Sequence, residues 1–490
     1  MKNSLKIILV LSLCFLFQSC FEDRDDKGIF ASEINDFVWK GMNTVYLYKD
    51  FVPDLANDRF MSDEEYGDYL NSFSSPDELF ESLIYQRETV DKFSWIVDDY
   101  IALEQQFSGV SKSNGMKFGL RKVPGSETDL FGYVRLVLPG SDAESKGLQR
   151  GDVFSGIDGT SLNFDNYLAL LSQDNYSIDL ATYDNNGTPD TADDIITPGG
   201  GSVSLTKSEF TENPIFKTDI LTVGSENVGY LMYNGFVRNF DVSLNSIFGL
   251  FQGNNIQHLV LDLRYNPGGS VNSSILLSSM ITGQFTGQIY STEQWNSDLT
   301  EQFFQQDPES LVNRFVDNDN GMSLNSLNLN TVYILTTGSS ASASELVINC
   351  LDPYIDVIQI GTTTTGKYQA SITVYDSPDL RREDANPNHT YAMQPLVLKE
   401  INAAGVTDYD NGLDPDIEIA EDISNLGVLG AETEPLLEMA LDDIAGNRQL
   451  IQSPFGTELI ADDSDFIRFG KEMYKTKTPP KSVRSPLKAN

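Results

Sequence analysis

The sequence predicts a multidomain α/β protein with a helical N-terminal region, a β-rich second region and an α/β core. The chain has 490 residues, which is too long for a single hydrophobic core. Apolar residues recur at helical spacing from Ser32 to about Phe107, within a linker and helical domain predicted over residues 20–106, whereas short alternating strands and turns are predicted over 107–212. Strand-like and helix-like segments then follow each other over 213–450, as in an α/β core. Residues 451–490 are predicted to form a C-terminal tail.

Residues 1–19 have the composition of an export signal, with Lys2 and Lys6 before an apolar stretch that ends just ahead of Cys20. The segment resembles a bacterial lipoprotein signal, in which such a cysteine is lipidated and becomes the new N-terminus. An ordinary cleaved signal and an uncleaved anchor are the alternatives. The acidic run Glu22–Asp26 is similar to signals that direct some Gram-negative lipoproteins to the cell surface. The resemblance implies an outer-membrane lipoprotein of the cell envelope, periplasmic or surface-exposed, held to the membrane by its lipid.

The composition excludes one class of partner. The chain carries 72 acidic and 33 basic residues, a net charge of −39, and such a charge repels the phosphate backbone of nucleic acids. One cysteine, Cys350, follows Cys20, so no disulfide framework can form. Cys350 lies in an apolar stretch and is predicted to be a buried free thiol. No apolar run long enough to span a membrane follows residue 20.

Local signals place helices in the N-terminal region. Ser75 is predicted to cap a helix, with Pro76 at its first position and Glu78 placed to close a capping box. Trp39 and Trp95 are predicted to be core residues of this region rather than binding residues.

Two stretches of the β-rich region resemble parts of a PDZ domain. Ser141–Val153 is similar to a helix and turn of that domain, and Phe118, Gly119 and Leu120 are similar to its carboxylate-binding loop. In such a loop, backbone N–H groups hold the C-terminal carboxylate of a peptide, which adds a strand to the sheet. The resemblance therefore implies partners that are proteins or peptides with free C-termini.

An acidic loop in the same region raises the question of a metal. Asp184–Asp194 interleaves carboxylates with Asn and Gly, as calcium loops do. It lacks the glutamate that ends an EF-hand loop, and no flanking helices are predicted. We interpret it as an acidic surface loop, with calcium binding as the alternative, and we predict no other metal site and no cofactor.

The α/β core carries residues that suggest nucleophilic catalysis. A predicted strand runs into Ser340–Glu345, a turn of small residues that leads into a helix. Such a turn exposes a side chain, and the free amides at the helix start face a developing anion. A serine becomes a nucleophile when a neighbour takes its proton, and a buried lysine can do so if its pKa is lowered. Ser342 and Lys367 are candidates for these roles; an ordinary turn before a helix is the alternative for Ser342.

The two histidines of the chain are weaker candidates for a base. His258 adjoins an apolar strand, and His389 lies in a polar, turn-like stretch. A lysine base for Ser342 is therefore favoured.

Three stretches, Leu261–Gly269, Ser340–Glu345 and Gly366-Lys367, resemble in this order the C-terminal processing peptidases, also called tail-specific proteases. The resemblance extends from about residue 107 to 420, and these peptidases usually carry a PDZ domain before the catalytic core. It implies a serine endopeptidase that works through an acyl-enzyme.

The resemblance also assigns residues to roles. It implies that Ser342 is the nucleophile, that Lys367 is the general base, and that the oxyanion hole is formed by the backbone N–H groups of Ala343, Gly268 and Gly269. Many members have glycine after the lysine and glutamine four positions on, where this chain has Tyr368 and Ser371. Gln369 is the candidate for the third catalytic residue.

The departures after Lys367 keep a rival hypothesis open, namely a non-catalytic peptide-binding surface lipoprotein that retains the fold. A lipoprotein that grips polysaccharide is a further alternative. The basic tail from about Phe466 is predicted to be a mobile end. The physiological substrate, the membrane leaflet and the oligomeric state are not specified by the sequence.

Overall fold

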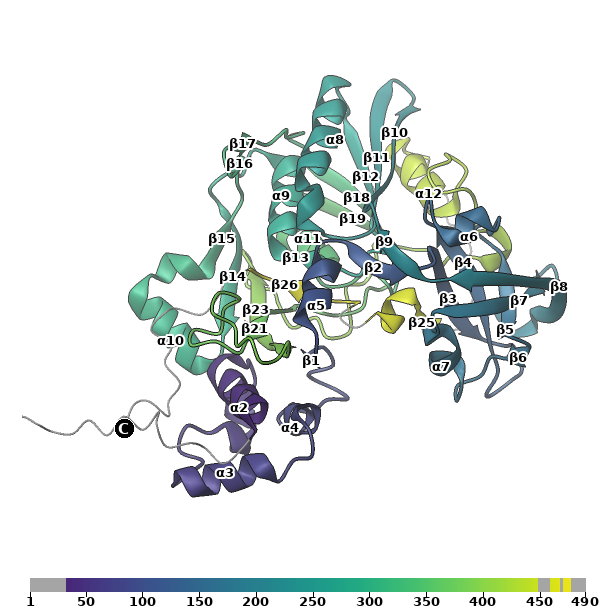
Figure 1. The fold of residues 1–490 in the computed structure, drawn as a ribbon. Coiled ribbons are helices and arrows are strands. Elements are labelled where there is room, and N and C mark those ends of the chain that lie inside the picture. Colours follow the sequence, from purple (N-terminus) through teal and green to yellow (C-terminus); the bar gives the residue numbers. More distant parts are fainter. Residues whose placement is uncertain (1–31, 448–458, 468–469, 477–490) are drawn as a thin grey trace, which may run out of the picture.

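The computed structural model describes residues 32–447, 459–467 and 470–476. In Figure 1 the N-terminal helices lie at the bottom, the α/β core above them, and a β-rich domain to the right. The mixed α/β architecture and the helical N-terminal region are as predicted. Cys20 and the rest of the predicted export signal lie outside the described residues. In the described part of the chain, no helix is both long and apolar enough to cross a membrane.

The N-terminal region packs around Trp39, which is only 1% exposed. Ser75 caps α4 as predicted, because its hydroxyl accepts the N–H of Glu78 at 3.1 Å. The Glu78 carboxylate, however, accepts the N–H of Ser74 at 2.8 Å. Trp95 is only partly buried and lies beneath the Arg87 guanidinium. The elements of the region are α2 (Glu33–Val45), η2 (Lys49–Phe51), η3 (Pro53–Leu55), α3 (Asp63–Asn71), α4 (Pro76–Ser82), β1 (Trp95–Val97) and α5 (Tyr100–Phe107).

The β-rich domain is an antiparallel sheet with two short helices. Its strand order is β25-β3-β4-β5-β7-β8, and β6 pairs with β5. A separate ribbon of β2 and β9 joins it to the core. The elements are β2 (Val110–Ser113), β3 (Met116–Lys122), β4 (Leu130–Val137), α6 (Asp142–Ser145), β5 (Val153–Ile157), β6 (Thr160–Ser161), α7 (Tyr167–Ser172), β7 (Asn175–Asp184), η4 (Thr191–Asp193), β8 (Ile195–Thr206), β9 (Ser208–Thr211) and β25 (Leu459–Asp462).

The first core sheet has the order β10-β11-β12-β18-β19-β24 and is parallel except for β10. Helices α8, α9 and α11 cover one face and α12 covers the other, which explains why its central strands are apolar on both faces. The elements are β10 (Ile215–Val223), β11 (Glu226–Tyr233), η5 (Arg238–Phe240), α8 (Asp241–Gly253), β12 (His258–Asp262), α9 (Val271–Thr282), β18 (Thr331–Thr336), α11 (Ala343–Leu351), β19 (Asp356–Gly361), β24 (Ile417–Glu418), η7 (Ile423–Asn425) and α12 (Pro435–Ile444).

The second core sheet collects strands from distant parts of the chain in the order β13-β26-β20-β23-β14-β15. It lies between the first sheet and the N-terminal helices. A three-stranded sheet, β1-β22-β21, ties the N-terminal region to it. The remaining elements are β13 (Gly269–Ser270), β14 (Ile289–Trp295), α10 (Ser297–Gln306), η6 (Pro308–Leu311), β15 (Val312–Arg314), β16 (Asn318–Asp319), β17 (Met322–Ser323), β20 (Gln369–Ser371), β21 (Val374–Tyr375), β22 (Ala392–Gln394), β23 (Leu396–Asn402), η8 (Asp463–Phe466) and β26 (Met473–Tyr474).

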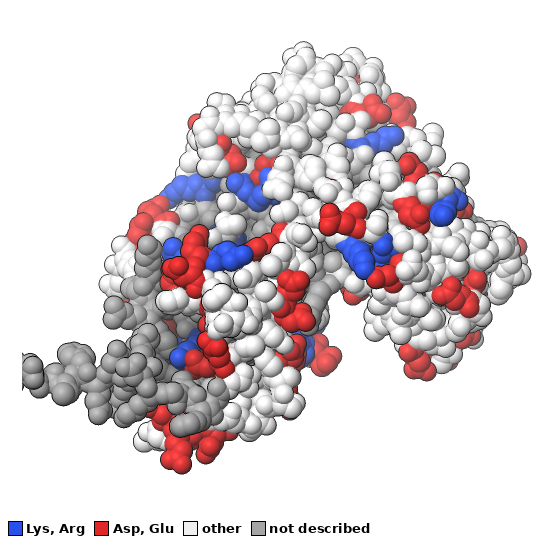
Figure 2. Space-filling view, in the orientation of Figure 1, with Lys and Arg blue, Asp and Glu red and all other residues white. Residues whose placement is uncertain are grey.

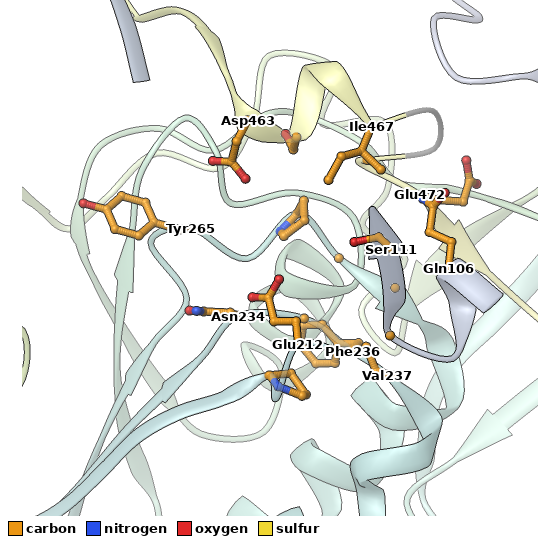
Figure 3. Close-up of a pocket in the computed structure, with 18 of the residues that line it drawn as sticks. Gln106, Ser111, Glu212, Asn234, Phe236, Val237, Tyr265, Asp463, Ile467 and Glu472 are labelled. Carbon is orange, nitrogen blue, oxygen red and sulfur yellow. The ribbon is translucent and has the colours of Figure 1, made fainter. Parts of the chain in front are cut away.

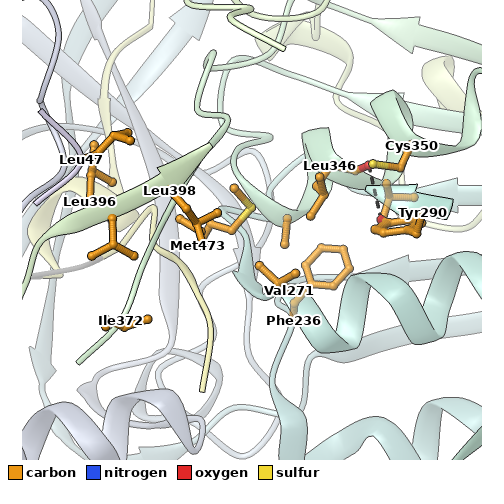
Figure 4. Packing of buried hydrophobic residues seen from close by; sticks show 14 of the residues in the cluster. Leu47, Phe236, Val271, Tyr290, Leu346, Cys350, Ile372, Leu396, Leu398 and Met473 are labelled. Carbon is orange, nitrogen blue, oxygen red and sulfur yellow. Dashed lines mark hydrogen bonds between the residues drawn. The ribbon is translucent and has the colours of Figure 1, made fainter. Parts of the chain in front are cut away.

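The prediction of a mobile end from Phe466 is wrong for residues 470–476. Met473 is fully buried and lies close to Leu398 and Val271 in the largest hydrophobic cluster (Figure 4). The Lys475 side chain is 4% exposed and pairs with the buried carboxylates of Glu293 and Glu400. The basic residues that suggested a solvated tail include a counter-ion for the interior of the core.

On the face drawn in Figure 2, the acidic side chains are spread over the surface rather than gathered in one patch. This distribution agrees with an acidic, solvated surface as the main role of the excess charge.

Candidate active site

Ser342 lies where strand β18 has turned into helix α11, as the sequence predicts. It is the N-cap of that helix, with φ 59° and ψ −114°. A positive φ is unfavourable for a residue with a Cβ atom and is found where the surrounding structure fixes it, often at functional sites. The turn thus holds the Ser342 side chain in one orientation.

The preceding loop of the first sheet fixes this turn. The Ser340 hydroxyl donates to the carbonyl of Leu263 at 2.8 Å, and the Ser344 hydroxyl donates to the carbonyl of Asn266 at 3.0 Å. The Ala341 N–H donates to the same Asn266 carbonyl at 3.1 Å. The small polar residues on either side of Ser342 therefore act as structural ties.

The structure brings Gly268 to Ser342 and Ala343. A Cβ atom at Gly268 would lie 2.5 Å from the Cβ of Ser342 and 3.1 Å from the Ala343 nitrogen, and Gly268 has φ 113°. Only glycine fits this contact. The N–H of Gly268 already donates to the Asn266 side chain at 2.9 Å. Of the predicted oxyanion donors, Ala343 is the first amide of a helix, where intrahelical acceptors are lacking.

Lys367 is fully buried in the loop between strands β19 and β20. Its ammonium lies over the Phe93 ring, 4.7 Å from the centroid, and 3.1 Å from the Glu472 carboxylate. Burial lowers the pKa of Lys367, although Glu472 acts against this shift. A lysine in this setting becomes neutral at a lower pH than one in water, and only the neutral amine can accept a proton.

Lys367 and Ser342 meet at one acceptor. The Ser342 Oγ donates to the Lys471 carbonyl at 2.7 Å, and the Lys367 Nζ donates to the same oxygen at 2.9 Å. The structure thus brings the two predicted catalytic side chains together around a peptide carbonyl of the chain itself.

Glu345 joins the two loops and was not identified from the sequence. Its Oε2 accepts the N–H of Ser342 at 2.7 Å and the N–H of Lys367 at 2.9 Å. Its Oε1 accepts the N–H of Gly366 and the hydroxyl of Thr364, both at 2.6 Å. Burial raises the pKa of Glu345 to about 7, although these hydrogen bonds lower it. Its position three residues after Ser342 is that of a capping-box glutamate, which is the signal that could have identified it.

A buried ionic cluster supports strand β12 beneath the site. The Arg264 guanidinium, 0% exposed, binds Asp262 at 2.8 Å and Glu434 at 2.6 Å. The Arg264 carbonyl accepts the hydroxyl of Thr337. Thr337 begins residues 337–345, which surround the candidate nucleophile and which we call the nucleophile turn. This cluster anchors the loop that leads to Gly268.

Gln369 is not paired with the candidate base. Its Nε2 donates to the Tyr48 hydroxyl at 3.0 Å. The polar side chains next to Lys367 are Glu472 and, behind it, Ser371, which donates to the Glu472 carboxylate. The role of Gln369 as the third catalytic residue stays a prediction.

The residues predicted to form a carboxylate-binding loop belong to a strand instead. Phe118, Gly119 and Leu120 lie inside strand β3, and β4 and β25 pair with the two edges of that strand. The register places Gly119 opposite Asp462 and Leu120 opposite Ala461. A strand of the chain itself therefore occupies the edge that the sequence assigned to an incoming peptide.

The other candidates have structural partners. His258 pairs with Glu226 at 2.7 Å, and His389 pairs with Asp376 at 2.9 Å. Cys350 is a buried free thiol, as predicted.

The acidic loop Asp184–Asp194 ties itself together, with Asp193 accepting the Thr188 hydroxyl and Asp194 the Tyr183 hydroxyl. Among the residues that the structure describes, no group of three or more His, Cys, Asp or Glu side chains is placed to hold a metal ion.

The fold and the site together define a class. An α/β core presents a strained serine at a helix start, beside a buried lysine, and it follows a helical and a β-rich region. This is the arrangement of a serine-type peptidase.

The chain belongs to peptidase family S41, the family of the C-terminal processing peptidases. The sequence pattern described as "Peptidase family S41" matches residues 227–419, and the one described as "Peptidase S41 N-terminal domain" matches residues 33–95. The first match contains Ser342, Lys367 and the Gly268-Gly269 turn, and the second covers helices α2 to α4.

Individual relatives agree with this family. A carboxyl-terminal-processing protease of Picosynechococcus is 24% identical over 360 residues, which cover 72% of this chain and 75% of the relative. The chloroplastic carboxyl-terminal-processing peptidase 2 of Arabidopsis thaliana is 30% identical over 141 residues, 28% of this chain and 26% of that protein. The crystal structure of an S41 protease from Bacteroides fragilis superposes with a TM-score of 0.63 at 26% identity, covering 84% of this chain and 98% of that one.

Proposed function

We propose that this serine peptidase is an endopeptidase that works through a Ser342–Lys367 pair and an acyl-enzyme. The observation that carries the proposal is the Glu345 carboxylate, which holds the backbone amides of both residues at 2.7 and 2.9 Å. One buried side chain thus fixes the distance between nucleophile and base.

The chemistry follows from this arrangement. Neutral Lys367 takes the Ser342 proton as Oγ attacks the carbonyl carbon of the substrate, and backbone amides near Ala343 and Gly269 stabilise the oxyanion. The lysine ammonium then gives its proton to the leaving amine, and an ester to Ser342 remains. Water, deprotonated by the same lysine, hydrolyses this ester and restores both side chains.

The acyl-enzyme provides the test. The protein is mixed with a peptide ester substrate and quenched in acid, and the digested protein is analysed by mass spectrometry. We expect an acyl adduct on the peptide that contains Ser342 in the wild type and none in Ser342→Ala. Turnover by both proteins without any adduct would contradict the mechanism, and a lack of turnover and labelling in every form of the protein would favour the non-catalytic peptide-binding alternative.

The β-rich domain is proposed to act as a PDZ domain that recruits proteins by their C-termini. The edge of β3 that β25 occupies is suited to strand addition, because main-chain hydrogen bonds bind an extended peptide whatever its side chains are. Strand β25 of the chain itself pairs there, which supports the ability of this edge to accept a strand.

We further propose that Cys20 is lipidated and anchors the protein in the outer membrane. The support is the sequence pattern of residues 1–20, which lie outside the described residues. Cys20→Ser should abolish incorporation of labelled fatty acid and move the protein from the membrane to the soluble fraction, with Cys350→Ser as the control. Labelling that persists in Cys20→Ser would contradict the proposal.

A further inference from the structure

The C-terminal segment covers the path between the β-rich domain and the catalytic pair. We define residues 459–467 and 470–476 as the C-terminal strap. Its first part, β25, adds to the outer edge of β3, with Ala461 opposite Leu120. Its second part, β26, pairs in parallel with Gly269 and Ser270 of β13. The strap therefore contacts both regions that a recruited substrate has to use.

The strap also engages the catalytic side chains directly. The Lys471 carbonyl accepts from Ser342 and Lys367, and the Glu472 carboxylate accepts from Lys367 and Ser371. Attack requires the hydroxyl to face a carbonyl carbon and the carbonyl oxygen to face backbone amides. Here the oxygen faces the hydroxyl and the ammonium instead. The strap is bound in an unproductive orientation, and Glu472 favours the charged form of the base.

Buried contacts anchor the second part of the strap. Met473 is fully buried in the core (Figure 4), and the Tyr474 ring stacks on Phe107 with centroids 4.1 Å apart. Lys475 pairs with Glu293 and Glu400. This part of the strap is packed like the interior of the protein.

Paired charges hold the first part of the strap. Asp462 binds Arg135 of β4 at 3.3 Å and accepts the hydroxyl of Ser339, which belongs to the nucleophile turn. Asp463 binds Lys117 at 3.2 Å. Departure of the strap would leave Arg135 without its carboxylate in a buried site, which is costly unless another anion replaces it. A ligand that displaces the strap is therefore favoured if it brings carboxylates to these cations.

A cavity of about 150 Å³ remains beside the strap. Asp463 and Ile467 of the strap line one side, and Asn234 and Phe236 line the other (Figure 3). Lys117, Arg135 and the Gly268-Gly269 turn also line it. The cavity thus connects the two cations to the candidate oxyanion hole and continues the path that the strap covers.

We propose that the C-terminal strap is an internal ligand of the substrate path, that this path accepts an extended acidic peptide, and that the strap must leave before a substrate reaches Ser342. The inference rests on the proposed peptidase function, since it concerns the same site. It makes the protein, as folded here, a latent enzyme.

The first experiment loosens the strap without touching the catalytic pair. Lys475→Gln removes the charge that pairs with Glu293 and Glu400, and Tyr474→Ala removes the stack on Phe107. Lys49→Gln is the matched control, because Lys49 is also 4% exposed and pairs with a carboxylate, Asp298, outside the strap. The readouts are the rate at which a fluorophosphonate labels Ser342, the cleavage of an unfolded protein, and the melting temperature of each variant.

We expect both strap variants to be labelled about ten- to a hundredfold faster than the wild type. Loss of one charge-assisted contact shifts the opening equilibrium by such a factor, and truncation of a buried aromatic ring shifts it by at least as much. Lys49→Gln should be labelled at the wild-type rate. If Lys475→Gln does not fold, Tyr474→Ala decides. Equal labelling in the wild type and in a folded strap variant overturns the inference.

The second experiment tests the acidic ligand. A synthetic peptide of residues 459–476 is added to the Tyr474→Ala protein, beside the same peptide with Asp462→Asn and Asp463→Asn. The acidic peptide should slow the labelling, and the amide peptide should need an at least about tenfold higher concentration. Equal inhibition by the two peptides contradicts the acidic preference.

The two proposals can fail separately. Faster labelling of Ser342 in the strap variants, without cleavage of any unfolded protein, would support the strap and contradict the peptidase function. Wild-type protein that cleaves as fast as the strap variants would support the peptidase function and contradict the strap.

Discussion

The two six-stranded sheets of the core meet at Ser342 and Lys367, but the chain builds them in different ways. The parallel strands β11, β12, β18, β19 and β24 of the first sheet follow one another in sequence order. The second sheet combines β13, β14, β15, β20 and β23 with β26 from the C-terminal strap. In the proposed mechanism, the loops after β18 and β19 carry the catalytic pair, and β26 of the second sheet limits access to it. A mutation in these loops should therefore abolish the reaction, whereas a mutation in the strap should change how often the site is open.

The largest effect is expected for Ser342→Ala in the nucleophile turn. Loss of a nucleophile that acts with its base as a unit lowers kcat on the order of 10⁶-fold. The melting temperature should fall only slightly, because the variant loses one hydrogen bond, to the Lys471 carbonyl, and the ties of the turn come from Ser340 and Ser344. The check is kcat on an unfolded protein together with a thermal melt. Undiminished cleavage by a folded Ser342→Ala protein would show that Ser342 is not the nucleophile.

Lys367 should show the next largest effect, and it adds a pH signature. Burial lowers its pKa, and the base has to be neutral, so activity should rise with pH through a value below the ordinary lysine range. Lys367→Arg should be as inactive as Lys367→Ala, a loss of about 10²–10⁴-fold, because a guanidinium does not release its proton. Lys112→Arg, on the exposed surface, is the control. An active Lys367→Arg enzyme would exclude the lysine base.

Glu345→Gln should reduce kcat by a smaller factor, about ten- to a hundredfold. The amide keeps the size of the side chain, but its NH₂ group must face two donors, either Ser342 and Lys367 or Gly366 and Thr364. The nucleophile and base then lose their fixed spacing. Glu438→Gln, on the exposed face of α12, should leave kcat unchanged. An unaltered kcat in Glu345→Gln would show that Glu345 does not position Ser342 and Lys367 for the reaction.

The same variant should change the dependence of stability on pH. Burial raises the pKa of Glu345 from 4.5 to about 7, so the folded state binds its proton more tightly than the unfolded state does. The stabilisation that this proton provides is complete below pH 4.5 and is lost as pH rises to about 7, about 3 kcal/mol in total. Denaturant unfolding at pH 4.5 and pH 8 should show this loss in the wild type and not in Glu345→Gln. Identical pH dependence would mean that Glu345 does not titrate in this range.

The difference between the sheets also explains what the sequence could predict. Strands β12 and β18 and the Ser342 turn are visible in the sequence, because an apolar run followed by small residues is a local pattern. Lys367 could be placed after β19 for the same reason. Glu345 was missed because its local role, a helix cap, conceals its contact with Lys367 across the site.

The strap could not be predicted because its partners are distant in sequence. Glu293, Glu400 and Phe107 have no local pattern that marks them as partners of residues 474 and 475. Basic residues near a chain end usually indicate a solvated tail. In this fold one of them, Lys475, neutralises two buried carboxylates. The PDZ resemblance of Phe118–Leu120 could not indicate that β25 pairs with this strand.

A loss of binding rather than of kcat is expected for recruitment by the β-rich domain, and it tests whether the strap only controls access to the site. If the edge of β3 and the cations Lys117 and Arg135 hold the C-terminus of a substrate, amidation of that terminus removes a charge-assisted contact worth about 1.5–3 kcal/mol, or roughly ten- to a hundredfold in binding. The loss should appear in the initial rates of long unfolded substrates below saturation, measured with the Tyr474→Ala protein so that the strap does not compete. Short peptides that reach Ser342 without touching β3 should be cleaved equally well with either terminus, and they are the internal control. Equal rates for the amidated and free long substrates would show that recruitment does not depend on the terminal carboxylate, whereas a penalty in short and long substrates alike would place the carboxylate contact at the catalytic pair itself.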